Sequence, residues 1–137
     1  MSWKEISPEH WDESAFRMIG KRMLLVGTPA GSRVNAMTAS WGGFGVLWGK
    51  PVVYLWIRPE RYTHSLLEEG RCFSANILPQ GMEEVYRICG SHSGRDTDKP
   101  AQCGLTAQRS EGIPFFAESE TTALCRLLYQ PPAVMGC

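Results

Sequence analysis

The stretch RVNAMTASWGGFGVLWGKPVVYLWIR, residues 33–58, carries the strongest β-strand signal in the chain. Residues 33–41 alternate apolar or small side chains with polar ones, which is typical of a half-buried strand. Residues 42–51 are rich in glycine and are predicted to turn the chain. Residues 52–58 are rich in branched and aromatic side chains, and Pro59 ends the strand that they predict. This stretch therefore predicts two strands joined by a glycine-rich turn.

The segments on either side predict further short strands and a few short helices. Additional strands are predicted at residues 21–28, 71–78, 113–116 and 121–129. Helices are predicted from Ser7-Pro8 onward, at residues 64–69 and at residues 81–90. Several successive strands have no helix between them, which disfavours parallel βαβ winding. We therefore expect a mainly β protein, a small β-barrel with two or three short helices packed on it.

Length and composition predict a single globular domain over residues 1–137. A chain of this size buries only a modest core, so oligomerisation is a reasonable expectation. The chain carries 14 basic and 14 acidic residues, and its net charge of zero gives no support for a nucleic-acid or anionic-membrane partner.

The remaining composition argues for a cytoplasmic protein. The longest apolar run, Val52–Ile57, is far too short to span a membrane, and the N-terminal residues are too polar and acidic for a signal peptide. The five cysteines are odd in number and lack the paired spacing of a zinc site. We interpret them as reduced thiols, most of them small buried apolar side chains.

Familiar catalytic and metal-binding motifs are absent from the sequence. The three histidines are scattered and show no metal-ligand spacing such as HExxH. The run GGFG lacks the register of a dinucleotide-binding GxGxxG motif, and no phosphate-binding P-loop is present. No GxSxG elbow and no convincing serine or cysteine triad appears. We therefore expect no metal site and no catalytic triad.

Residues 58–65, RPERYTHS, have the composition of an anion-binding segment. Arginines and hydroxyls surround a predicted helix N-terminus, where free N–H groups and the helix dipole favour a phosphate. Arginine would add charge-assisted hydrogen bonds. The alternative is that Arg58 and Arg61 simply form surface ion pairs with Glu60 or Glu68.

Two further segments offer similar potential. Residues 89–99, CGSHSGRDTDK, combine glycines with two cations and two aspartates, although a solvated loop with local turns is the simpler interpretation. Residues 35–43, NAMTASWGG, form a predicted strand of small and hydroxyl side chains that leaves room for a flat ligand. Trp41 and Trp48 could border such a ligand, although core or interface packing is the commoner role of tryptophan. The three segments could converge on one phosphorylated, planar, partly apolar molecule.

The run NAMTASWGGFGVLWGKPVVYLWIRPERYT, followed by CGSHSGRDTDK, closely resembles the flavin reductase-like family of FMN-binding split-barrel proteins, which includes the flavoredoxins. FRMIGKRMLLVGT before it and LCRLLYQ after it are also similar to that family, so the resemblance covers roughly residues 16 to 130. It implies a split β-barrel that forms a homodimer, with FMN bound near the subunit interface.

The resemblance also implies a set of cofactor-binding positions. These are Asn35, Met37, Thr38, Ala39, Ser40, Trp41, Arg58, Arg61, Tyr62, Thr63, Ser93, Gly94, Arg95, Asp96 and Lys99. The positions from 35 to 41 would line the isoalloxazine ring, largely through backbone groups, and those from 58 to 63 would hold the ribityl chain and phosphate. The loop from 93 to 99 would close over the cofactor, with Arg95 and Lys99 as its direct contacts.

The function that the resemblance implies is an oxidoreductase that passes electrons from NAD(P)H through bound FMN to a flavin, a metal centre or another acceptor. Because the flavin supplies the redox chemistry, no catalytic side chain is required. Two alternatives stay open. One is a non-catalytic, flavoredoxin-like electron carrier, and the other is a barrel that binds a small ligand other than flavin.

The end of the sequence departs from the family. Members usually continue past LYQ with another strand-forming segment, whereas this chain reads PPAVMGC. We therefore expect the usual C-terminal strand to be missing. The barrel would then expose an unpaired strand edge, with consequences for stability and activity.

Overall fold

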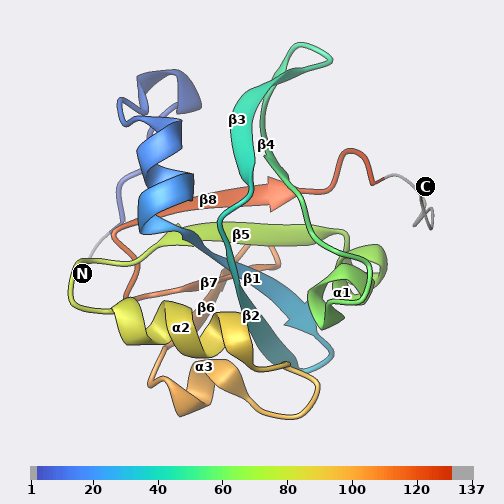
Figure 1. Ribbon diagram of the computed structural model, residues 1–137. Helices are drawn as coiled ribbons and strands as arrows, with labels where there is room; N and C mark the ends of the chain where they lie inside the picture. Colours follow the sequence, from blue (N-terminus) through green and yellow to red (C-terminus); the bar gives the residue numbers. More distant parts are fainter. Residues whose placement is uncertain (1–2, 131–137) are drawn as a thin grey trace.

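The computed structural model describes residues 3–130 and shows a mainly β fold (Figure 1). Its centre is a four-stranded sheet of order β2-β1-β5-β8, accompanied by the two-stranded sheets β3-β4 and β6-β7. The three sheets do not close on one another, as expected for a split barrel. The predicted C-terminal departure falls on residues 131–137, outside the described residues. No helix within residues 3–130 is both long and apolar enough to cross a bilayer.

The central sheet is antiparallel throughout. Its strands are β1 (Leu24–Ala30), β2 (Arg33–Ala39), β5 (Cys72–Ile77) and β8 (Thr121–Arg126). Strand β2 lies at one end of this sheet, so one of its edges pairs with no strand of the described chain. Pro29 lies opposite Val34 and has no N–H, so that pair cannot be a hydrogen-bonded one. By alternation, Ala36 and Thr38 direct their backbone groups away from β1, toward the open edge.

The prediction that residues 42–51 only turn the chain is wrong, because most of them form a strand. Strand β3 (Gly42–Leu47) pairs with β4 (Lys50–Leu55) to make a hairpin that extends away from the rest of the protein (Figure 1). The glycines are required by packing: a side chain at Gly43 would collide with the Tyr54 ring. The turn is limited to Trp48 and Gly49, whose φ values of 53° and 73° suit a two-residue hairpin turn.

The second hairpin covers one face of the central sheet. It consists of β6 (Ala107–Ser110), which the sequence pattern did not predict, and β7 (Ile113–Phe116), which it did. A Cβ at Gly27 on β1 would come within 2.7 Å of Ser74 Oγ and 3.1 Å of the Phe116 ring, so a side chain there would displace them. Glycine at this position therefore lets β7 pack against the sheet.

Five short helices complete the fold. They are η1 (Pro8–His10), η2 (Phe16–Arg22), α1 (Tyr62–Gly70), α2 (Glu83–Ser91) and α3 (Lys99–Gln102). The predicted strand at residues 21–28 starts too early, because residues 21 and 22 belong to η2. Met18 and Ile19 of that helix are buried against the sheet, and Met23, with φ of 67°, separates helix from strand.

The two faces of the central sheet are covered by different helices. On one face, Leu25 and Ala36 pack with Val85, Tyr86 and other buried residues of α2 and its surroundings. On the opposite face, Val26 and Met37 pack with Leu67 of α1. The outer strand β2 thus lies between α1 on one side and α2 and its following loop on the other. This arrangement brings the segments around residues 35, 62 and 94 together.

Candidate functional site

Asn35 is the residue at which the three segments meet. Its side chain is 4% exposed, and its Nδ2 donates to Thr63 Oγ1 of α1 at 2.9 Å and to Thr28 Oγ1 of β1 at 3.4 Å. Its Oδ1 is buried and has no hydrogen-bond partner within residues 3–130. A buried acceptor without a partner is costly, typically by about 1–3 kcal/mol, so this oxygen is suited to a ligand donor.

Gly94 lies directly over that oxygen. A Cβ built on Gly94 would overlap Asn35 Oδ1 and would come within 3.3 Å of the Tyr62 ring. The loop after α2 can therefore approach β2 and α1 this closely only with glycine at position 94. The close approach seals the pocket described next from one side.

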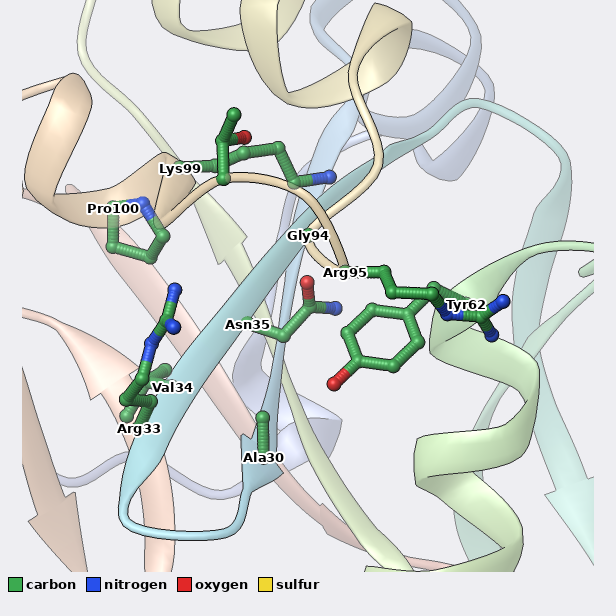
Figure 2. Close-up of a pocket in the computed structure, with 10 residues that line it drawn as sticks. Ala30, Arg33, Val34, Asn35, Tyr62, Gly94, Arg95, Lys99 and Pro100 are labelled. Carbon is green, nitrogen blue, oxygen red and sulfur yellow. The ribbon is translucent and has the colours of Figure 1, made fainter.

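A polar pocket of about 80 Å³ opens beside Asn35 (Figure 2). It is formed by the β1–β2 hairpin, the start of α1 and the loop that leads into α3. The lining residues are Ala30, Arg33, Val34, Asn35, Tyr62, Gly94, Arg95, Thr97, Lys99 and Pro100. Pockets that hold a whole small molecule usually measure about 300–1,000 Å³, so this one has room for one end of such a molecule.

The pocket carries a concentration of positive charge in a chain whose net charge is zero. The Arg95 guanidinium lies over the Tyr62 ring, 5.0 Å from its centroid, and this cation–π contact holds it against the start of α1 (Figure 2). Arg33 forms an exposed ion pair with Asp98 at 3.5 Å. Because the pocket lining includes two arginines and a lysine but no acidic side chain, the local charge favours an anion.

Lys99 is 2% exposed, and its ammonium is held inside the protein. Nζ donates to the carbonyl of Cys89 at 3.0 Å and to that of His92 at 2.8 Å, which fixes the end of α2 to the start of α3. Burial, with a smaller contribution from the nearby charge of Arg61, lowers the pKa of Lys99 to about 8. An ammonium has three N–H donors, so one stays available toward the pocket.

The structure brings six of the sequence-predicted positions around this pocket. They are Asn35, Tyr62, Thr63, Gly94, Arg95 and Lys99. Arg61 also lies close enough to influence Lys99. Other predicted positions lie elsewhere: Arg58 is exposed and pairs with Glu60 at 3.6 Å, and Ser93 and Asp96 are exposed on the outer side of the loop.

The predicted ring-binding positions on β2 lie further along the strand. Met37 and Ala39 are buried in the core on the α1 face, whereas Ser40 and Trp41 are exposed. Thr38 faces α2, and its Oγ1 donates to the Tyr86 carbonyl at 2.6 Å. Its backbone groups nevertheless reach the open edge of β2, as the register requires. A flat ligand contacting β2 through backbone groups would therefore lie along this edge.

Sequence reasoning missed Arg33, which contributes one of the pocket's cations. A signal for it existed, because Arg33 and Asn35 are two residues apart on one strand and so share a face. Thr97 and Pro100 were also missed. Their place in the pocket depends on the path of the loop between α2 and α3, for which the sequence carries no periodic pattern.

The fold and pocket together define a small split-barrel protein with a cationic site at the outer strand of its central sheet. The chain matches the family model described as a flavin reductase like domain over residues 16–135, and it therefore belongs to that family. The resemblance stated from the sequence is confirmed. Among curated proteins, none matches this chain.

Solved structures of similar fold are consistent with this assignment. The flavoredoxin of Desulfovibrio vulgaris (Miyazaki F) is 28% identical with a TM-score of 0.75, over 81% of this chain and 62% of that protein. An FMN-binding protein from Thermus thermophilus is 28% identical with a TM-score of 0.70, over 94% and 69% respectively. An FMN-binding domain of a flavin reductases-like enzyme from Shewanella baltica shares the fold at 21% identity and a TM-score of 0.72, over 85% and 63%. The chain thus spans less than two thirds of the flavoredoxin and of the Shewanella domain.

The residues present fit one end of FMN. The pocket's cations match a phosphate, and the unpartnered Oδ1 of Asn35 matches a hydroxyl donor such as those of a ribityl chain. The isoalloxazine ring is too large for about 80 Å³ and would lie outside the pocket, along the edge of β2 that pairs with no strand of the described chain. The phosphate and ribityl end of FMN would therefore occupy the enclosed pocket, and its ring would lie along the unpaired edge of β2.

Proposed function

We propose that this protein binds FMN and passes electrons from NAD(P)H through the bound flavin to a flavin or another acceptor. The observation that carries the proposal is the convergence of three segments on Asn35, beside a pocket lined by Arg33, Arg95 and Lys99. Family membership supports it, as do the similar flavoredoxin and FMN-binding protein.

In this proposal each group of residues has a distinct task. Arg33, Arg95 and the remaining N–H of Lys99 bind the phosphate, and Asn35 Oδ1 accepts a hydrogen bond from the ribityl chain. Met37, Thr38, Ala39, Ser40 and Trp41 are the positions proposed to border the ring, chiefly through their backbone. The remaining proposed positions, Arg58, Arg61, Tyr62, Thr63, Ser93 and Asp96, support the phosphate end and the closing loop. FMN itself supplies the redox chemistry when bound, so the protein needs to bind, orient and partly expose it.

We also propose that the protein works as a homodimer in a reducing cytoplasm. The β3–β4 hairpin projects from the body of the protein and exposes large apolar side chains that nothing in the described chain covers (Figure 1). An exposed apolar surface of this kind is typical of an interface. The four cysteines within residues 3–130 are free thiols, which supports a reducing compartment.

The test begins with the visible spectrum of the purified protein and an FMN titration of the apoprotein. We expect a flavin spectrum and saturable binding, weakened on the order of tenfold to a hundredfold by replacing Arg95 and Lys99 together with alanine. A colourless protein that takes up no FMN would instead support a barrel for another ligand. Arg109→Ala is the matched control, because Arg109 is exposed on β6, which contributes no residue to the pocket.

Steady-state turnover distinguishes an NAD(P)H-dependent enzyme from a non-catalytic electron carrier. We expect steady oxidation of NADH or NADPH with free FMN as the acceptor. The carrier is favoured if the protein binds FMN tightly yet shows no nicotinamide oxidation above the rate of free flavin. Adding a separate reductase should then restore electron flow through the bound flavin.

A further inference from the structure

We propose that Cys89 and Cys103 form a reversible disulfide that locks the loop closing the cationic pocket. The bond joins the last turn of α2 to the residue that ends α3. Its effect on FMN exchange rests on the proposed function, whereas the formation of the bond does not.

The two thiols are already neighbours. Cys89 is fully buried in the core cluster with Leu25, Ala36 and Tyr86, and the partly exposed Cys103 packs against the same cluster. Lys99 connects the two residues, because its Nζ donates to the Cys89 carbonyl at 3.0 Å and its own carbonyl accepts from the Cys103 N–H at 3.0 Å. A disulfide between them requires their Cα atoms to lie within about 7 Å of each other.

The segment between the two cysteines is the pocket's own loop. Gly94, Arg95, Thr97, Lys99 and Pro100 all lie between residues 89 and 103, and all line the pocket. A bond at the two ends of this segment would restrict its opening without replacing any residue that contacts a ligand. The placement therefore couples thiol oxidation to ligand exchange.

The surroundings of the two thiols assign them different tasks. Burial raises the pKa of Cys89 to about 12, so its thiol stays protonated and shielded. Cys103 is the thiol that solvent reaches, and it is the site at which an oxidant would act first. The nearby charge of the Lys99 ammonium opposes the effect of burial and lowers the pKa of the Cys89 thiol.

The chemistry needs a hydroperoxide as oxidant. The Cys103 sulfur attacks the peroxide, becomes a sulfenic acid and releases water or an alcohol. The Cys89 sulfur then attacks the Cys103 sulfur, so that an S–S bond forms and the S–O bond breaks. The hydroxide that leaves takes the Cys89 proton and departs as water. A dithiol reverses the bond by exchange, reducing it to two thiols.

The test of the bond is a peptide map of the apoprotein after brief treatment with hydrogen peroxide. Trypsin cleaves after Arg87, Arg95 and Arg109, whereas Lys99 precedes a proline and resists cleavage. We expect residues 88–95 and 96–109 to appear as one linked pair that dithiothreitol separates. The proposal is overturned if Cys103 is driven to a sulfinic acid, or stays a thiol, without that linked pair appearing.

The test of the lock is the rate of FMN release, followed by flavin fluorescence after dilution of reduced and oxidised protein. We expect release on the order of tenfold slower in the oxidised protein, because the bond limits the open conformations of the loop. Cys103→Ser should abolish the difference, while Cys125→Ser, which alters a partly buried thiol beside a different cluster, should preserve it. Equal rates of FMN release from the reduced and oxidised wild-type protein would show that the disulfide does not restrict the loop. A protein that binds no FMN in either form refutes the proposed function instead, and the peptide map still decides the bond.

Discussion

At the scale of single residues, Gly94 and Asn35 form the most constrained contact of the candidate site. The loop can lie over Asn35 Oδ1 because Gly94 has no side chain. That contact keeps the amide beside the pocket and leaves its oxygen without a partner in the described chain. The site therefore requires glycine at position 94 because a side chain would collide with Asn35, and not because of an unusual backbone conformation.

Gly94→Ala should weaken FMN binding on the order of tenfold or more, because the added Cβ must push the loop away from β2. The midpoint of thermal unfolding should change little, since the loop is at the surface. Gly20→Ala is the control, as nothing lies within 4 Å of a Cβ at that position. Fluorescence titration of FMN measures both variants. Wild-type affinity in Gly94→Ala would show that the loop does not contact the cofactor.

Lys99 should give FMN binding a dependence on pH. Burial lowers the pKa of its ammonium to about 8 from the usual 10.5, so the charge is lost as the pH rises through about 8. FMN affinity should therefore fall on the order of tenfold between pH 7 and pH 9.5. Folding responds in the opposite sense. Between about pH 8 and 10.5 the unfolded chain holds more protons than the folded one, so this residue makes the free energy of unfolding rise with pH.

Titrations of FMN at several pH values, with urea unfolding alongside, measure both effects. Lys99→Met should remove both dependences, and Lys99→Arg should hold the affinity nearly flat with pH, because arginine stays charged. An affinity in wild type that does not change from pH 7 to 9.5 would exclude Lys99 from the phosphate end.

At the scale of elements, the β3–β4 hairpin has more apolar surface than its own packing explains. Val46 is 77% exposed, Trp48 is 67% exposed and Trp56 is 68% exposed. The hairpin is held to the body near its base by Phe44, Val53 and Leu55, which pack against the buried cluster that contains Met18 and Leu24. Its far end extends into solvent in this chain (Figure 1).

Placing a charge on that surface should break a homodimer. Val46→Glu is expected to shift the protein from dimer to monomer at micromolar concentration, because a buried unpaired carboxylate is costly at an interface. Gln108→Glu, on exposed β6, makes the same change in charge elsewhere and should leave the dimer intact. Light scattering during size-exclusion chromatography gives the mass of each. A wild-type protein that elutes as a monomer would contradict the dimer outright.

At the scale of the whole molecule, one buried amide joins the central sheet to the β6–β7 hairpin and the loop that follows it. Asn76 is fully buried and uses both ends of its side chain. Its partners are Leu25, Ser74, Phe116, Ser119 and Thr122. The bonds link β1, β5, β7 and β8, so the amide connects strands that are distant in sequence. A fully satisfied network of this kind favours one arrangement of those strands.

Asn76→Ala should lower the free energy of unfolding by about 3 kcal/mol, because it leaves several buried groups without partners. Thr122→Val removes a single bond and should cost about 1 kcal/mol. Urea unfolding followed by tryptophan fluorescence compares both with the wild type. Equal losses in the two variants would mean that the amide does not act as a shared link.

Much of the fold could be predicted from local pattern. The strands predicted at residues 71–78, 113–116 and 121–129 correspond to β5, β7 and β8, and the helix predicted at residues 64–69 corresponds to α1. The turn predicted over residues 42–51 was wrong at residues 42–47 for a local reason. Glycine usually interrupts strands, but here it makes room for the Tyr54 ring. The short strand β6 is polar and exposed throughout, so no alternation marked it.

The sequence by itself determined the family, the main strands and the three segments rich in small residues and charge. Those features are local, because alternation, turn residues and motifs are read within a few positions of the chain. The tertiary structure alone decided which side chains meet: Arg33 in the pocket, the Lys99 ammonium on two carbonyls, and Cys89 beside Cys103. Such contacts join residues from separate elements, and they depend on how the helices and strands pack, for which no neighbouring residue carries a signal.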